Sequence, residues 1–212
     1  MTLLTILILT GLLLLWNLFV IHFLTKWVYN FVLKFKDIPA EYIGRKFIHM
    51  FCGGIIAFLI PVFYDGYYEF VILSAYGLGV YLIFWRKYKL LYWFQVKENM
   101  FEVHFTLAYG TTLLIGVLLQ NLLIGLVPLL FMSFGDSVTG LVRAFTQKKQ
   151  KKSWDGSIAM FLVCSTIGYL FLGIYGIGVG AVATLVEKIP GIDDNITVPL
   201  VTALLVYVYG LI

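Results

Sequence analysis

Charged side chains are scarce in this sequence of 212 residues. Asp, Glu, Lys and Arg make up 12% of it, whereas hydrophobic residues make up 61%. So few charges exclude an ordinary soluble domain. The apolar runs also lack a polar face at helical spacing, and several approach the roughly 18–20 residues that a helix needs to cross a bilayer. The sequence therefore predicts an all-α, polytopic integral membrane protein.

Three further absences narrow the possible functions. The two cysteines, Cys52 and Cys164, lie inside apolar runs without CxxC spacing, which excludes a disulfide framework and a zinc site. No GxxxxGK[ST] sequence occurs, so any nucleotide site is not a P-loop. The first apolar run lacks a basic start and is too long for a cleaved signal peptide. No nucleic-acid partner is expected.

About eight transmembrane helices are predicted in one domain, residues 1–212. The seventh is short and rich in glycine and the eighth contains Pro199, so either could be a re-entrant or broken helix rather than a full span. Residues 1–40 form an N-terminal span and a cytoplasmic linker, and residues 41–200 hold the motifs described below. The predicted spans are 3–24, 46–63, 67–85, 103–119, 121–143, 156–172, 174–188 and 195–211.

The positive charges support this map. All 15 lysines and arginines fall in connections on one side: between spans one and two, between three and four, after five, and after seven. The positive-inside rule makes that side cytoplasmic and places both termini outside. We expect an integral protein of the cell membrane, with its active site on the cytoplasmic face.

Asp136 interrupts the fifth span. It lies seven residues before Arg143, which at 1.5 Å rise places it about 10 Å inside the inner boundary. A carboxylate at that depth needs a partner and usually faces a polar cavity or a neighbouring helix. The small residues around it, Gly135 to Gly140, leave room for another group or for helix packing.

A cationic loop follows this span directly. It carries Lys148, Lys149, Lys151 and Lys152 and ends in Ser153, Trp154, Asp155, Gly156 and Ser157. The lysines alone are typical of a topology anchor that contacts anionic lipid headgroups. A small-residue turn at the start of a helix, however, offers free backbone N–H groups to phosphate. Lysines, a helix N-terminus and a buried carboxylate together could hold a polyphosphate and Mg²⁺.

Two more polar clusters belong to the same side. Arg45 and His49 are four residues apart at the start of the second span and therefore share a helix face. Glu187, Asp193, Asp194 and Asn195 form an acidic turn between spans seven and eight. These clusters could be a basic flank and a solvated loop. With Asp136, the acidic turn could also supply oxygen ligands for a hard cation.

Together these residues resemble the CTP-dependent lipid-alcohol kinases, a family that includes dolichol, phytol and farnesol kinases and yeast-type diacylglycerol kinase. The match covers residues 41–200 in the family's order, with Thr139 in place of Ala and Asp155 in place of Glu. The four matching blocks are Glu41, Arg45, Lys46, His49 and Gly53; Gly135, Asp136 and Gly140; Lys152, Ser153, Gly156 and Ser157; and Glu187, Asp194, Asn195, Thr197 and Pro199.

The resemblance implies a kinase that phosphorylates the hydroxyl of a membrane lipid alcohol, with CTP as donor and CDP as product. It implies that Asp136, Asp194 and Glu187 coordinate Mg²⁺, and that the proton acceptor is Asp136, His49 or Asp155. The nucleotide would contact Arg45, Lys46, Lys148, Lys149, Lys151, Lys152, Ser153, Gly156, Ser157 and Asn195.

Two alternatives remain open at this point. A CTP-using cytidylyltransferase that makes a CDP-lipid would have a similar ligand set, but its longer signature is not found after Ser153. A transporter would be favoured by an inverted repeat or by charges near the midplane of the membrane. No convincing repeat occurs, and the charges gather toward one face.

Overall fold

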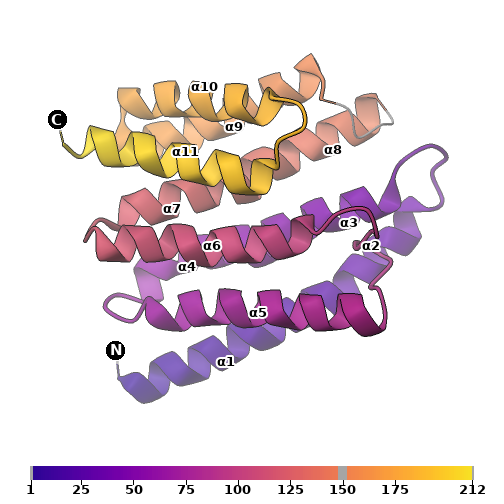
Figure 1. The fold of residues 1–212 in the computed structure, drawn as a ribbon, viewed down its shortest axis with the longest axis horizontal. Helices are drawn as coiled ribbons and strands as arrows, with labels where there is room; N and C mark the ends of the chain where they lie inside the picture. The colour runs from indigo at the N-terminus through magenta and orange to yellow at the C-terminus, as the bar shows by residue number, and fades with distance from the viewer. Residues whose placement is uncertain (1, 148–151, 212) are drawn as a thin grey trace.

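The computed structural model describes residues 2–147 and 152–211, which contain helices and no strands. Figure 1 shows the helices lying side by side along the long direction of the molecule. They are α1 (Leu3–Phe19), α2 (Thr25–Val32), α3 (Ala40–Ile48), α4 (Ile55–Phe63), α5 (Glu69–Tyr88), α6 (Phe101–Leu118), α7 (Leu122–Leu130), α8 (Asp136–Thr146), α9 (Trp154–Leu172), α10 (Ile174–Lys188) and α11 (Asp194–Tyr209).

Three π-helical turns join pairs of these helices into long continuous rods. Val20–Leu24 joins α1 to α2, His49–Gly54 joins α3 to α4, and Phe131–Gly135 joins α7 to α8. A π turn inside an α-helix is uncommon and is frequent at functional sites. Here one π turn begins at His49 and another ends directly before Asp136.

Each predicted span corresponds to one rod or helix. Six of them are long and apolar enough to cross a membrane: Leu3–Val32, Ala40–Phe63, Glu69–Tyr88, Phe101–Leu118, Leu122–Thr146 and Trp154–Leu172. The chain is therefore an integral membrane protein. Helices α10 and α11 have 15 and 16 residues and are each continuous, also through Pro199. Eight full crossings remain a prediction.

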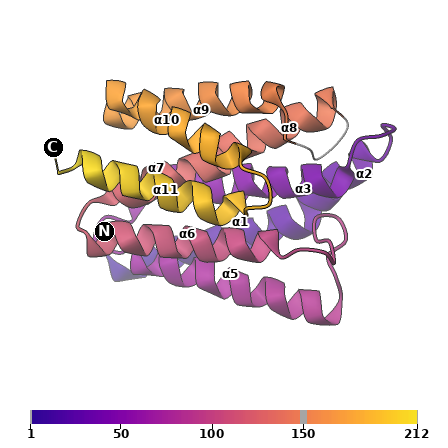
Figure 2. The ribbon, with the colours of Figure 1, turned by 45° about the horizontal axis from the view of Figure 1, so that its top comes forward.

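The rod formed by α7 and α8 is the most buried of the six. Figures 1 and 2 show it between α6, α9 and α11, with the α3–α4 rod beside it. Asp136 begins α8 and is 4% exposed. Its carboxylate therefore faces protein and not lipid.

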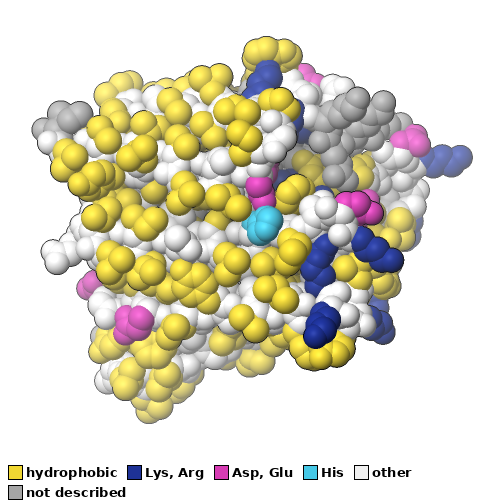
Figure 3. Space-filling model, in the orientation of Figure 1, with side chains coloured by type: hydrophobic (Ala, Val, Ile, Leu, Met, Phe, Trp, Pro, Cys, Tyr) yellow, Lys and Arg dark blue, Asp and Glu magenta, His cyan; other side chains and the backbone are white. Residues whose placement is uncertain are grey.

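The basic residues gather at one end of the bundle. We call the basic end the end formed by the α2–α3, α5–α6, α8–α9 and α10–α11 connections; Figure 1 shows both chain termini at the opposite end. In Figure 3 the Lys and Arg side chains of that face lie toward the basic end, and the rest of the face is mostly hydrophobic. This segregation agrees with the sidedness that the sequence predicts.

Candidate active site

Asp136 is held by two side chains from the α3–α4 rod. Lys46 Nζ lies 2.6 Å from both carboxylate oxygens, and His49 Nδ1 lies 3.1 Å from Oδ2. All three residues are buried. Because Lys46 and His49 are three residues apart, they share one face of the rod. The buried carboxylate thus has an ionic partner within the protein.

Gly140 makes room for this ion pair. A Cβ atom on Gly140 would lie 2.8 Å from Lys46 Cγ and 2.8 Å from the Tyr42 hydroxyl oxygen. The lysine stem therefore crosses α8 where a glycine leaves the backbone bare. The Ser137 hydroxyl also donates to the Lys46 carbonyl oxygen at 3.0 Å, which fixes α3 against α8.

A second ion pair lies two turns further along α8. Arg143 donates to Glu187 on α10 through both terminal nitrogens, at 2.7 and 2.9 Å. The Glu187 side chain is fully buried, and a two-pronged pair of this kind is well suited to a buried carboxylate. Gly156 packs against the pair, since a Cβ there would lie 2.5 Å from Arg143 Nε.

Lys152 connects the second pair to the acidic turn. Its Nζ donates to the carbonyl oxygens of Glu187 and Ile189 and lies 3.7 Å from Asp194 Oδ2. Asp194 precedes the apolar part of α11 and lies outside the six membrane-length helices. Burial, and then the nearby charge of Asp136, raise the pKa of the Asp194 carboxyl to about 6.

Ser153 begins α9 as its N-cap and accepts from the Gly156 N–H at 3.3 Å. The Ser157 hydroxyl donates to the Ser153 carbonyl oxygen at 3.0 Å. The predicted turn therefore starts a helix at the basic end, as the phosphate hypothesis requires. Lys148, Lys149 and Lys151 lie outside the described residues.

The other predicted residues lie around this cluster in different ways. Arg45 is buried, donates to Asn99 and stands over the rings of Tyr42 and Phe101. Asn195 is buried beneath the acidic turn, and its Oδ1 has no hydrogen-bond partner among the described residues. Asp155 is exposed and accepts from Gln147 at 2.9 Å, away from Asp136.

The three predicted metal ligands do not form a ready cation site. Lys46 and His49 occupy Asp136, and Arg143 occupies both oxygens of Glu187. Within residues 2–147 and 152–211, no group of three or more His, Cys, Asp or Glu side chains could hold a metal ion. The donor set therefore does not fit Mg²⁺ as arranged, and Asp194 is the carboxylate with the loosest contacts.

Comparisons with known proteins show what the chain as a whole resembles. The chain is 29% identical to a probable chloroplastic phytol kinase 2 of Glycine max over 87% of its length and 73% of the relative's. It is 29% identical to a probable phytol kinase of Triticum aestivum, over 81% and 69%. Phytol kinase 1 of Arabidopsis thaliana is 35% identical over 40% of this chain and 36% of its own.

The chain is similar to these phytol kinases over most of its length. The resemblance that the motifs indicate is thereby confirmed, and the phytol kinase relatives indicate a phosphotransferase with an alcohol acceptor. No family model matches the chain, and no solved structure matches it. The names of these phytol kinases place them in chloroplasts, so the comparisons do not support the predicted cell membrane or cytoplasmic face.

The sequence alone does not indicate the role of two residues near this site. In the sequence, Arg143 is only one of the positive charges that set topology. Arg143 follows Asp136 by seven residues, which places both side chains on one face of a helix. Glu102 is not noticed at all. It is 5% exposed at the start of α6, where Arg86 and Gln95 donate to its Oε1 at 2.8 and 3.0 Å.

Proposed function

We propose that the protein transfers the γ-phosphoryl group of CTP to the hydroxyl of an isoprenoid lipid alcohol. The lipid monophosphate and CDP are the products. One observation carries the proposal: the Asp136–Lys46–His49 cluster lies beside the cations Arg143 and Lys152 at the basic end of a membrane bundle. A hydroxyl at the membrane surface and a polyphosphate can meet there.

The nucleotide is assigned to the side of Lys152 and the N-terminus of α9. Lys152 is partly exposed, and its ammonium group lies between the carbonyl groups that end α10 and the acidic turn. Backbone N–H groups of the first turn of α9 add partial positive charge. CTP as the donor, with Mg²⁺ as its companion, rests on the family resemblance.

His49 is the proton acceptor that the geometry favours. Its Nδ1 faces Asp136, which orients the ring, and Nε2 makes no hydrogen bond to a described residue. With the Nδ1 proton donated to Asp136, Nε2 can take the proton of the lipid hydroxyl as the oxygen bonds to the γ-phosphorus. The bond from that phosphorus to the bridging oxygen breaks, and CDP leaves with the electron pair. Phosphoryl transfer depends mainly on such positioning and on charge neutralisation.

The deciding experiment follows the label of CTP into lipid. Purified protein in vesicles with phytol and Mg²⁺ receives CTP labelled at either the γ or the α phosphate. We expect the γ label in the lipid fraction and the α label in CDP. The α label in lipid would instead indicate a cytidylyltransferase, and neither label in lipid would contradict an enzyme of this kind.

A matched pair of variants makes the result specific to the site. Asp136→Asn should abolish labelling, because the ring of His49 loses its orienting charge. Asp65→Asn makes the same chemical change in the α4–α5 connection at the opposite end, where Asp65 accepts from the Tyr68 hydroxyl. That control should label lipid as the wild type does. Equal activity of both variants would contradict the assignment of the site.

The side of the membrane is part of the proposal. The basic end carries the site, and the positive-inside rule assigns that end to the cytoplasmic side of a cell membrane. CTP supplied only to the outside of sealed vesicles tests whether the site lies at the basic end. Labelled lipid should then appear only in the vesicles in which the basic end of the protein faces outward.

A further inference from the structure

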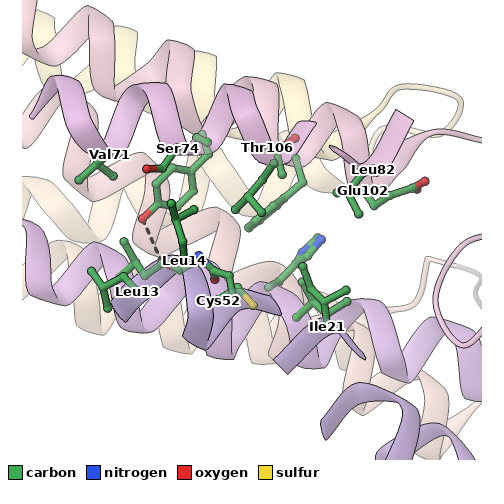
Figure 4. Close-up of a pocket in the computed structure, with 18 of the residues that line it drawn as sticks. Leu13, Leu14, Ile21, Cys52, Val71, Ser74, Leu82, Glu102 and Thr106 are labelled. Carbon is green, nitrogen blue, oxygen red and sulfur yellow. Dashed lines mark hydrogen bonds between the residues drawn. The ribbon is translucent and has the colours of Figure 1, made fainter. Parts of the chain in front are cut away.

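An apolar cavity lies between α1, the α3–α4 rod, α5 and α6, beside the cluster described above. The centre of a water-sized sphere can reach about 70 Å³ of it, within about 820 Å³ of space between protein atoms that is partly open to the surroundings. Leu13 and Leu14 on α1, Ile48 and Ile56 on the α3–α4 rod, and Leu78 on α5 are typical of its lining. Figure 4 shows side chains from several helices pointing into one shared space.

The cavity is long and runs parallel to the helices. Its lining spans residues 10–21 of the first rod, 45–56 of the second and 71–82 of α5. Each stretch covers eleven helical steps, which corresponds to about 16 Å at 1.5 Å per residue. The first rod is the least buried of the six membrane-length helices, so this wall of the cavity borders the bilayer. A long, narrow, apolar space of this kind fits an extended hydrocarbon chain.

The two ends of the cavity differ in chemistry. In Figure 4, Glu102 and Leu82 lie at one end of the lining residues, and Leu13, Val71 and Ser74 lie toward the other. Arg45 and His49 line the cavity too, and His49 is also a hydrogen-bond partner of Asp136. The His49 ring also stacks on Phe105, with 3.9 Å between ring centroids. One wall of the cavity is thus formed by the residue that contacts Asp136.

Glu102 brings an unused hydrogen-bond acceptor to this end. Its Oε1 accepts from Arg86 and Gln95, whereas Oε2 is buried and has no partner among the described residues. Asn17 also lines the cavity, and its Oδ1 is likewise buried without a hydrogen-bond partner among the described residues. A buried acceptor without a partner has lost its hydrogen bonds to water and gained none in return, which is unfavourable. An ionised carboxylate oxygen can only accept, so the missing partner of Glu102 is a donor such as a hydroxyl group.

We infer that this cavity binds the isoprenoid chain of the lipid alcohol, with its hydroxyl at the end that Glu102 and His49 line. The single hydroxyl proton is donated to Glu102 Oε2 when the alcohol binds, and the hydroxyl turns to donate it to His49 Nε2 for the transfer step. The inference rests on the proposed function, since it names how the acceptor substrate of that site is held. The chain lies between α1 and α5, and the hydroxyl lies at the basic end. Burial of the hydrocarbon supplies affinity, and the carboxylate fixes which end of the lipid faces His49.

Chain length provides the first test. Ser74→Phe fills the end of the cavity away from Glu102, and Leu73→Phe adds a ring on the exposed side of the same helix, where Leu73 is 65% exposed. With geraniol, farnesol and phytol as acceptors, Ser74→Phe should lower kcat/KM for phytol by about tenfold or more and leave geraniol nearly unchanged. Leu73→Phe should keep the wild-type profile. Identical profiles for all three proteins would overturn the inference.

Glu102 is tested through the alcohol KM. Glu102→Gln keeps the shape and loses the charge, and it should raise the KM for the alcohol without changing the KM for CTP. Arg86→Gln is the control, because it removes the ion pair to Oε1 and leaves Oε2 in place. An equal rise in both variants would show a structural role for Glu102 and contradict its contact with the hydroxyl.

A binding measurement separates this inference from the proposed function. A farnesol analogue with a photoreactive diazirine at its chain end is irradiated with the protein, and labelled peptides are mapped by mass spectrometry. Label on the cavity side of α1 and α5, displaced by phytol, supports the cavity even if no phosphate transfer occurs. Label confined to outward residues such as Leu12 and Leu15 would overturn it, even if the protein proves to be a kinase.

Discussion

At the scale of single residues, the pairing of Asp136 with Lys46 decides what a substitution does. The two side chains are buried and 2.6 Å apart. Removing one member of a buried pair leaves an uncompensated charge, which costs about 3–5 kcal/mol. Loss of Asp136 should therefore harm stability as well as activity.

Asp136→Asn and Lys46→Met test this coupling. We expect each single variant to melt at a lower temperature than the wild type in detergent. Asp136→Asn combined with Lys46→Met should recover part of the loss, since no buried charge is left without a partner. The double variant should stay inactive, measured by transfer of the γ label. Additive losses of stability would contradict the ion pair.

Gly140 allows a second, milder test of the same contact. Gly140→Ala places a methyl group against the Lys46 stem and the Tyr42 hydroxyl, which should displace the ammonium group from Asp136 and lower kcat. Gly178→Ala is the control, because a Cβ there meets no atom within 4 Å. This control should be neutral or stabilise by up to about 1 kcal/mol, the helix propensity difference between the two residues. Unchanged turnover in Gly140→Ala would contradict close packing of Lys46.

The sequence predicts that Asp136 needs a partner, but it does not predict Lys46. The two residues are 90 positions apart, and hydropathy carries no information on which rods are neighbours. Arg45 and His49 do share a face, as their spacing predicts, and both line the cavity. Lys46 is the residue after Arg45, and its side chain, like that of His49, contacts Asp136 on α8.

At the scale of helices, α10 supports the site through its close contact with α9. A Cβ on Gly176 would lie 2.7 Å from Gly168 Cα, and one on Gly180 would lie 2.7 Å from the Ser165 nitrogen. Gly176 and Gly180 form a GxxxG sequence, which brings helix backbones together in membranes. This contact places Glu187, near the end of α10, beside Arg143.

Gly176→Val should therefore reduce activity from a distance. The added side chain separates α9 from α10 and shifts Glu187, so we expect a lower kcat and a lower melting temperature. Gly178→Val makes the same change on the open side of α10 and should alter neither strongly. Wild-type turnover in Gly176→Val, with the protein folded, would show that the site does not depend on this contact.

At the scale of the whole molecule, hydropathy and charge placement predict more than the motifs do. The eight expected spans match the observed rods and helices, because long apolar runs and basic connections are local signals. The cavity has no such signal. Its lining consists mostly of residues such as Leu13, Ile56 and Leu78, which look like any other part of a span until the rods are brought together.

The number of membrane crossings depends on whether α10 and α11 span the bilayer. Helix α10 has 15 residues and is thus about 22 Å long, shorter than the roughly 30 Å apolar core of a bilayer. Eight crossings place the start of α10 and the α10–α11 connection on opposite sides of the membrane, whereas six crossings place them on the same side.

Cysteine labelling in sealed vesicles distinguishes these cases, and buried Cys52 and Cys164 give little background. Ile174→Cys marks the start of α10 and Ile192→Cys marks the connection; both positions are exposed. Lys97→Cys provides the reference for the basic end. We expect an impermeant thiol reagent to label Ile192→Cys from the same side as Lys97→Cys, and Ile174→Cys from the other. Labelling of Ile174→Cys and Ile192→Cys from one side, with Lys97→Cys labelled from the other, would mean that α10 and α11 do not cross.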